Sequence, residues 1–220
     1  MPYFLGVALH QNMTLRRSLF IDLLGCGLSD RPECFRYTLA DHARAVAAAL
    51  DTAGVRDVNV VGHSLGGSVA IVLAYERPDL VARLVVAEPN LLPWDGDVSV
   101  GIARQEEDAF VDHGFDELVA RSDPDWVATL RMADPCALHR TAVGLCHGSR
   151  PVMHTMLCSL VIPRTLLYGS KSTPPTESRR LREAGVSLIE IRRAGHIMMK
   201  DNLDGFVSAI ARALGASADP

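Results

Sequence analysis

The sequence predicts an α/β fold in which a mostly parallel sheet carries helices on both faces. Short apolar runs rich in valine, leucine and isoleucine recur along the chain and are typical of buried strands. Segments with a helical spacing of apolar residues separate these runs, and such an alternation favours a parallel sheet. A glycine-rich turn, Gly62-His63-Ser64-Leu65-Gly66-Gly67, joins one of the strands to the helix after it.

Length and composition indicate one globular domain without a nucleic-acid or membrane role. The 220 residues are enough for a sizeable core, and 48% of them are hydrophobic. The net charge is −4, no basic run is present, and no apolar segment approaches the roughly 18 residues that a membrane span needs. Five cysteines without C-x-x-C spacing or a secretory signal favour free thiols, so a cytoplasmic location is expected. Oligomeric state is not predicted.

The first part of the chain shows the pattern β-α-β-α-β. Residues 17–22 form a short apolar run that is expected to be a strand, and the glycines and the proline of residues 23–32 predict a loop after it. The next helix is expected to begin after Thr38, an N-cap residue with Asp41 three positions later, and to stop at Gly54. The pattern continues with a strand at 58–61, a helix from Ser64 to about residue 77, and a strand at 84–87.

Between residues 91 and 161 this alternation stops, and an inserted helical cap is expected. The helical stretches expected there are 102–113, 115–121 and 125–132. Alternation resumes with a strand at 164–168, a helix at 177–184, a strand at 186–191 and a final helix at 201–214. The predicted organisation is therefore one core, residues 1–90 and 162–220, with a cap at 91–161.

The glycine-rich turn presents Ser64 as a candidate nucleophile. Glycines on either side are expected because a side chain there would clash with the neighbouring strand and helix. A serine hydroxyl needs an imidazole to take its proton, and the imidazole needs a carboxylate to hold its tautomer. Of the eight histidines, His196 is the candidate base, since it follows the last predicted strand at the same sheet edge as Ser64. His63 is expected to point away from Ser64 and to be structural.

These motifs, taken in order, resemble the α/β-hydrolase family. The order is strand, G-H-S-L-G-G, helix, helical insertion, strand and A-G-H, and residues 22–30 are similar to the family's loop after the strand two before the nucleophile. The resemblance covers residues 17 to 214. It implies a serine hydrolase of the esterase type, with a triad that runs serine, acid, histidine along the chain.

The resemblance leaves two positions open for the acid. The commonest position falls in residues 168–175, which contain no carboxylate, and Lys171 cannot accept a hydrogen bond from the imidazole. The other position follows the strand after the nucleophile helix and holds Glu88. A glutamate that closes an apolar strand is costly to bury alone, and His196 would be its partner. The alternatives are that Glu88 caps the strand or pairs with Arg83, and that Asp95, Asp97 or the more distant Glu177 is the acid.

Charge on the substrate oxygen needs hydrogen-bond donors, and the first is expected to be the backbone N–H of Leu65. In the family a second donor comes from an H-G loop about 25 to 30 residues before the strand that here holds Phe20. Only 16 residues precede this strand, and His10 is followed by Gln11. The chain is therefore expected to be shortened at its N-terminus and to lack that loop. Residues 3–9 then fill the gap in the sheet or form the helix after the loop, the sheet closes up, or the chain is a fragment of a longer reading frame.

The sequence as a whole predicts a serine hydrolase that acts on a small ester, lactone or related acyl substrate. Its catalytic residues would be Ser64, His196 and Glu88, and no metal or organic cofactor is implied. The residues expected to line the substrate pocket are His63, Leu91, Trp94 and Ile197. A halide-displacing relative would carry aspartate at position 64. The second hypothesis is a truncated or degenerate hydrolase that binds a ligand or partner without turnover.

Overall fold

The structure, a computed structural model, describes residues 2–13 and 17–215. Within these residues four strands form one parallel sheet, and their order in the sheet is their order in the chain. The strands are β1 (Val58–His63), β2 (Val81–Ala87), β3 (Arg164–Gly169) and β4 (Ser187–Ile191). The predicted α/β fold is confirmed. Because all four strands run in one direction, the residues that follow them meet at one edge of the sheet.

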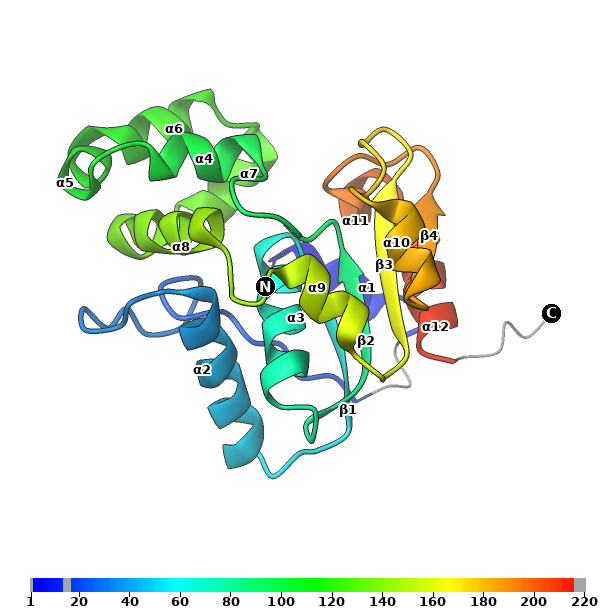
Figure 1. Cartoon of the computed structure of the whole chain (residues 1–220). Helices are drawn as coiled ribbons and strands as arrows, with labels where there is room; N and C mark the ends of the chain where they lie inside the picture. Colours follow the sequence, from blue (N-terminus) through cyan, green and yellow to red (C-terminus); the bar gives the residue numbers. More distant parts are fainter. Residues whose placement is uncertain (1, 14–16, 216–220) are drawn as a thin grey trace.

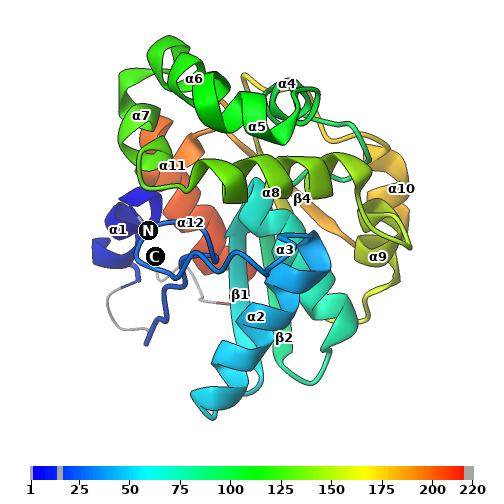
Figure 2. The same ribbon diagram turned by 90° about the vertical axis from the view of Figure 1, so that its left-hand side faces the viewer.

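Helices cover both faces of this sheet (Figures 1 and 2). Strand β2 shows why: Leu84 and Val86 are buried in the cluster on one face, and Val85 and Ala87 in the cluster on the other. The helices on the first face are α2 (Leu39–Thr52), α3 (Leu65–Glu76), α9 (Met153–Ser159) and α10 (Ser178–Glu183). Those on the second face are α1 (Pro2–Leu9), α11 (Met198–Asp201) and α12 (Leu203–Ala213). Among the described residues, no helix combines the length and the apolar character needed to cross a membrane.

Local signals set the two ends of α2 as predicted. The hydroxyl of Thr38 accepts a hydrogen bond from the N–H of Asp41 at 3.2 Å, which is the expected N-cap. Just past the helix, Gly54 adopts a positive φ of 65°, a conformation that glycine takes at little cost.

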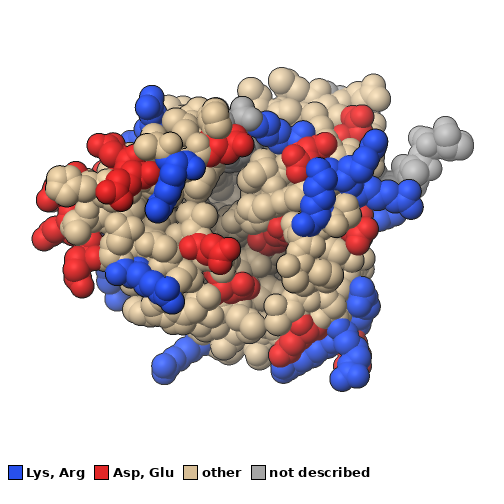
Figure 3. Space-filling model, turned by 90° about the horizontal axis from the view of Figure 1, so that it is seen from above, with Lys and Arg blue, Asp and Glu red and all other residues tan. Residues whose placement is uncertain are grey.

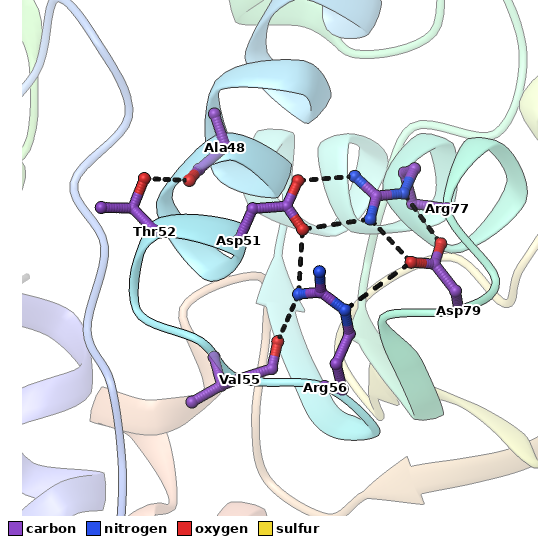
Figure 4. A network of polar contacts seen from close by, with 7 residues as sticks. All are labelled: Ala48, Asp51, Thr52, Val55, Arg56, Arg77 and Asp79. Carbon is purple, nitrogen blue, oxygen red and sulfur yellow. Dashed lines mark hydrogen bonds and ion pairs between the residues drawn. The ribbon is translucent and has the colours of Figure 1, made fainter.

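A network of ion pairs ties the end of α2 to the end of α3 (Figure 4). Arg77, directly after α3, pairs with Asp51 of α2 at 2.9 Å and with Asp79 at 2.6 Å. Arg56 joins the same network through Asp51, at 2.9 Å. These groups lie at the amino-terminal edge of the sheet, where β1 and β2 begin, so the network fixes the scaffold and leaves the opposite edge for chemistry.

The helical insertion forms a layer of its own over the carboxyl edge of the sheet (Figure 2). Its elements are α4 (Asp97–Ala103), α5 (Glu107–Ala109), the π-helical turn η1 (Phe110–Gly114), α6 (Phe115–Arg121), α7 (Pro124–Leu130) and α8 (Pro135–His147). They enclose a small core of buried apolar side chains, Ile102, Phe110, Leu118, Leu130 and Ala142. By contrast, α9 packs into the main core beside α3. The cap bounds of 91–161 stay a prediction.

The bounds of one cap helix differ from the prediction of 102–113. The helix begins earlier, at Asp97, and is interrupted after Ala103. The backbone carbonyl of Gln105 accepts a hydrogen bond from Nε2 of His139 in α8, at 2.7 Å, and is thus engaged across the cap. A contact between two helices therefore marks the break, and the local sequence pattern carries no sign of it.

The prediction of a strand at 17–22 is wrong. These residues have no regular secondary structure, and Leu19 and Phe20 are 60% and 41% exposed. A strand must pair its backbone groups, and within the described residues the edge strand β1 is paired with β2 alone. The nearby segment 2–9 is helical, and α1 packs against α11 and α12 on one face of the sheet. It does not fill a gap between strands.

A buried histidine joins the cap to the core. His42 of α2 is 1% exposed, and its Nε2 lies 3.2 Å from the hydroxyl of Thr141 in α8. Burial lowers the pKa of His42 to about 4, because the charged imidazolium cannot be hydrated there. The native state therefore binds fewer protons at this position than the unfolded state does at pH values below 6.5.

This histidine should make the protein less stable in acid. As the pH falls from 7 to 4, the unfolded chain takes up a proton at His42 that the native state refuses, so stability is lost, by up to about 3 kcal/mol. We expect the His42→Gln variant to lose correspondingly less over the same range. Urea unfolding of both proteins at pH 7, 5.5 and 4 measures the difference. Equal pH slopes for the two proteins would contradict a neutral His42.

Candidate active site

Ser64 sits on a strained turn between β1 and α3. Its backbone has φ 52° and ψ −125°, a conformation that residues other than glycine adopt only where the surroundings enforce it. The surroundings here are the strand and the helix: the N–H of Ser64 donates to the carbonyl of Ala87 at 2.8 Å, and the Ser64 carbonyl accepts from the N–H of Ser68 at 3.0 Å. The turn therefore presents the Ser64 side chain above the carboxyl edge of the sheet.

The glycines around Ser64 are required at two positions, and one of them is not the predicted one. A Cβ on Gly62 would lie 2.5 Å from the carbonyl oxygen of Gly66, and one on Gly67 would lie 3.2 Å from the carbonyl oxygen of Gly62. A Cβ on Gly66 would meet nothing within 4 Å. The expectation of a clash on both sides of Ser64 is thus right for Gly62 and wrong for Gly66, because the close approach of helix to strand falls at Gly67.

The structure brings the three predicted catalytic side chains together. Nε2 of His196 lies 3.1 Å from Oγ of Ser64, and Nδ1 of the same ring lies 2.7 Å from Oε2 of Glu88. Ser64 follows β1, Glu88 follows β2, and His196 lies in the loop between β4 and α11. The contacts form one continuous chain of hydrogen bonds from hydroxyl to imidazole to carboxylate, which is the arrangement that activates a serine.

Glu88 is held as a carboxylate. Burial opposes its ionisation, but hydrogen bonds from His196, from the N–H of Gly169 at 2.8 Å and from Ser172 outweigh burial and hold the pKa of Glu88 below its usual value. Its backbone has a positive φ of 42°, so the end of β2 is also strained. The alternative in which Glu88 pairs with Arg83 does not occur in the structure, since both carboxylate oxygens face the groups above.

The loop that carries His196 is anchored at several backbone groups. The N–H of Lys171 donates to the carbonyl of Ala194 at 2.8 Å, and the N–H of Gly195 donates to the carboxylate of Asp201 at 2.7 Å. The carbonyl of His196 itself lies 2.7 Å from Nε2 of His63. A carbonyl can only accept, so His63 is the donor.

The expected oxyanion donor, the N–H of Leu65, stands at the start of α3. Leu65 is the first residue of that helix, so its N–H has no acceptor within the helix and lies at the positive end of the helix dipole. Within the described residues we identify no second donor beside it.

The other residues expected to line a substrate pocket lie in different surroundings. Leu91 is 3% exposed and packs in the main core. Trp94 is 51% exposed, and its ring lies 6.0 Å from that of His147 in α8. Ile197, next to His196, packs partly against the second cluster. His63 points to the His196 loop. A pocket lined by all four residues stays a prediction.

The surface over the carboxyl edge is hollowed beside the cap, and Asp and Glu side chains lie at the margin of the hollow (Figure 3). A separate groove of about 540 Å³ lies at the other edge of the sheet, where Arg83, Arg164 and Ser187 begin or adjoin the strands. Ser64, His196 and Glu88 do not border this groove. The site is therefore located by the geometry of reactive groups. No group of three potential metal ligands occurs among the described residues.

Comparison with known proteins gives a family match over more than half of the chain. A sequence profile described as the alpha/beta hydrolase fold matches residues 8–131. Lipase LipV of Mycobacterium tuberculosis is 50% identical over 68 residues, which are 31% of this chain and 25% of that protein. The 2-hydroxymuconate semialdehyde hydrolase of Pseudomonas putida is 35% identical over 81 residues, or 37% of this chain and 29% of that protein. The matched stretches thus span about a quarter of these relatives.

A solved structure shares the fold over most of the chain. A thermophilic esterase from Thermogutta terrifontis superposes with a TM-score of 0.70 and 22% sequence identity, covering 88% of this chain and 78% of that one. At this level of identity the likeness extends to the fold, and the chemistry must be argued from the side chains.

Proposed function

The chain belongs to the α/β hydrolase fold family, and from this premise we propose that it is a serine hydrolase of small ester, lactone or related acyl substrates. The observation that carries the proposal is the unbroken contact chain from Ser64 Oγ through the His196 ring to Glu88, at 3.1 and 2.7 Å. Its relatives include proteins named as a lipase and as a hydrolase of a semialdehyde. A family member that displaces halide would need a carboxylate where this chain has a serine.

In the first step Ser64 Oγ attacks the substrate carbonyl while its proton moves to Nε2 of His196. The new imidazolium is stabilised by the carboxylate of Glu88, which accepts the Nδ1 proton in a hydrogen bond. The negative charge that forms on the carbonyl oxygen is met by the N–H of Leu65 at the start of α3. His196 then gives its proton to the leaving alcohol, and the acyl group stays on Ser64.

In the second step a water molecule attacks the acyl group, and His196 takes a proton from this water. The tetrahedral intermediate collapses, Ser64 regains the proton from Nε2, and the carboxylic acid leaves. Every proton is thus handled by one imidazole, whose tautomer is set by Glu88. The step needs no metal ion.

The experiment that tests this proposal is active-site labelling. Purified protein, shown by circular dichroism to be folded, is treated with a fluorophosphonate, and the adduct is located by peptide mass spectrometry. We expect a single adduct on Ser64 and parallel loss of p-nitrophenyl acetate hydrolysis. Folded protein that takes up no label at Ser64 would sink the enzyme proposal.

One observation favours a second candidate, a protein that binds a ligand or partner without turnover. Leu65 N–H is the single oxyanion donor identified in the described residues, and the loss of one such donor typically costs about 10²- to 10³-fold in turnover. The labelling experiment separates the two, because a non-catalytic protein would neither react with the fluorophosphonate nor hydrolyse the ester.

A further inference from the structure

His63 makes a contact with the proposed base that its place beside Ser64 does not predict. It ends β1, so its side chain leaves the sheet on the side opposite to that of Ser64. There its Nε2 reaches the backbone carbonyl of His196 at 2.7 Å, and the two rings lie 4.7 Å apart, tilted by 47°. The strand that carries the nucleophile is thereby tied directly to the residue that carries the base.

The remaining contacts of the His196 loop hold it at other points. Arg192 is bound through its carbonyl to Asn202 at 2.9 Å, Arg193 through its N–H to Ser170 at 2.8 Å, and Gly195 through its N–H to Asp201 at 2.7 Å. These contacts come from the β3 and α12 sides of the molecule. The contact from His63 comes from β1, the element that continues into the nucleophile, and it acts on the peptide of His196 itself.

We propose that His63 is a positioning residue, whose Nε2–H holds the His196 carbonyl and thereby fixes the His196 imidazole relative to Ser64. The inference rests on the proposed function, since it assigns His196 as the base. Positioning matters because misplacing a reacting group by about 1 Å can cost roughly 100-fold in rate. His63 does not touch the reacting atoms, so its effect is on geometry.

The charge state of His63 fits this role. Its pKa is lowered to about 4 by burial and, to a lesser degree, by the neighbouring His196. His63 therefore stays neutral at pH 7, and no second positive charge opposes the imidazolium that forms on His196 during turnover. A lysine or arginine could also donate to this carbonyl, but its permanent charge would oppose that step.

The test compares two replacements at position 63. His63→Phe keeps an aromatic ring against His196 and removes the donor, whereas His63→Gln keeps an N–H donor at a similar reach. His113→Gln, an exposed position on the cap, is the matched control. We expect His63→Phe to lower kcat for p-nitrophenyl acetate about 100-fold with little change in KM. His63→Gln should recover most of this loss, and His113→Gln should match the unaltered protein. If His63→Phe does not fold, His63→Leu replaces it.

A second readout does not depend on turnover. The short contact between His196 Nδ1 and Glu88 should give a strongly downfield proton signal in NMR, assigned by its loss in His196→Ala. This signal should disappear or exchange rapidly in His63→Phe and persist in His63→Gln. An unchanged signal and unchanged kcat in His63→Phe would overturn the proposal. If the unaltered protein shows no turnover but the signal still depends on the donor, positioning by His63 stands and the hydrolase function falls.

Discussion

The Glu88→Gln variant should lose about 10³- to 10⁴-fold in kcat for p-nitrophenyl acetate while keeping its fold, because the substitution reverses the tautomer of His196. The N–H of Gly169 donates to one oxygen of Glu88 at 2.8 Å, and His196 Nδ1 lies 2.7 Å from the other. In the variant, Gly169 can only donate, so it selects the amide oxygen. The amide NH₂ group then faces Nδ1 and donates to it. The ring must carry its proton on Nε2, where it cannot accept the proton of Ser64.

The matched controls for this variant are the other carboxylates that the sequence offers as the acid. Asp95→Asn, Asp97→Asn and Glu177→Gln should each retain kcat within about twofold, since surface substitutions of this kind change energies by roughly 0.5 kcal/mol or less. Thermal unfolding should show that Glu88→Gln is folded at the assay temperature. A normal rate in Glu88→Gln, together with a loss in any of the other three, would move the acid to that residue.

The sequence was sufficient to predict that Ser64, Glu88 and His196 lie near one another. Each follows an apolar strand, and in a parallel sheet all such positions fall on one edge, so the argument needed topology and no distances. The acid was the harder choice, because the position after β3 carries Lys171 where a carboxylate was expected. The physical cost of an unpartnered glutamate after β2 decided it, and the structure pairs Glu88 with His196 at 2.7 Å.

What the sequence could not predict are contacts made by backbone groups. The N–H of Gly169 on Glu88 and the carbonyl of His196 against His63 carry no side-chain signature, so no motif announces them. The failed strand at 17–22 has the same origin. An apolar run shows that a segment could be a strand, but pairing depends on a neighbour elsewhere in the chain, and β1 offers residues 17–22 no ladder of hydrogen bonds in the described structure.

The Gly169→Ala variant should damage stability and activity together, because this glycine is where the acid and the base loop are packed against β3. A Cβ at position 169 would lie 2.3 Å from the carbonyl oxygen of Ala194 and 2.7 Å from that of Gly195. These are backbone atoms, so the loop itself must move. We expect a loss of about 3 kcal/mol in the free energy of unfolding, and about 100-fold in kcat because His196 moves with the loop.

Alanine in place of Gly101 is the matched control, because a Cβ on this glycine of α4 would meet nothing within 4 Å. Gly101→Ala should leave kcat unchanged and raise stability by up to about 1 kcal/mol, since alanine is the better helix former. Urea unfolding and p-nitrophenyl acetate kinetics on both variants measure the two effects. The cause of the expected loss is steric, since Gly169 has no positive φ that would itself exclude alanine. Near-normal stability and kcat in Gly169→Ala would therefore mean that the 194–195 backbone can retreat without moving His196, and that His196 does not depend on β3 for its place beside Ser64.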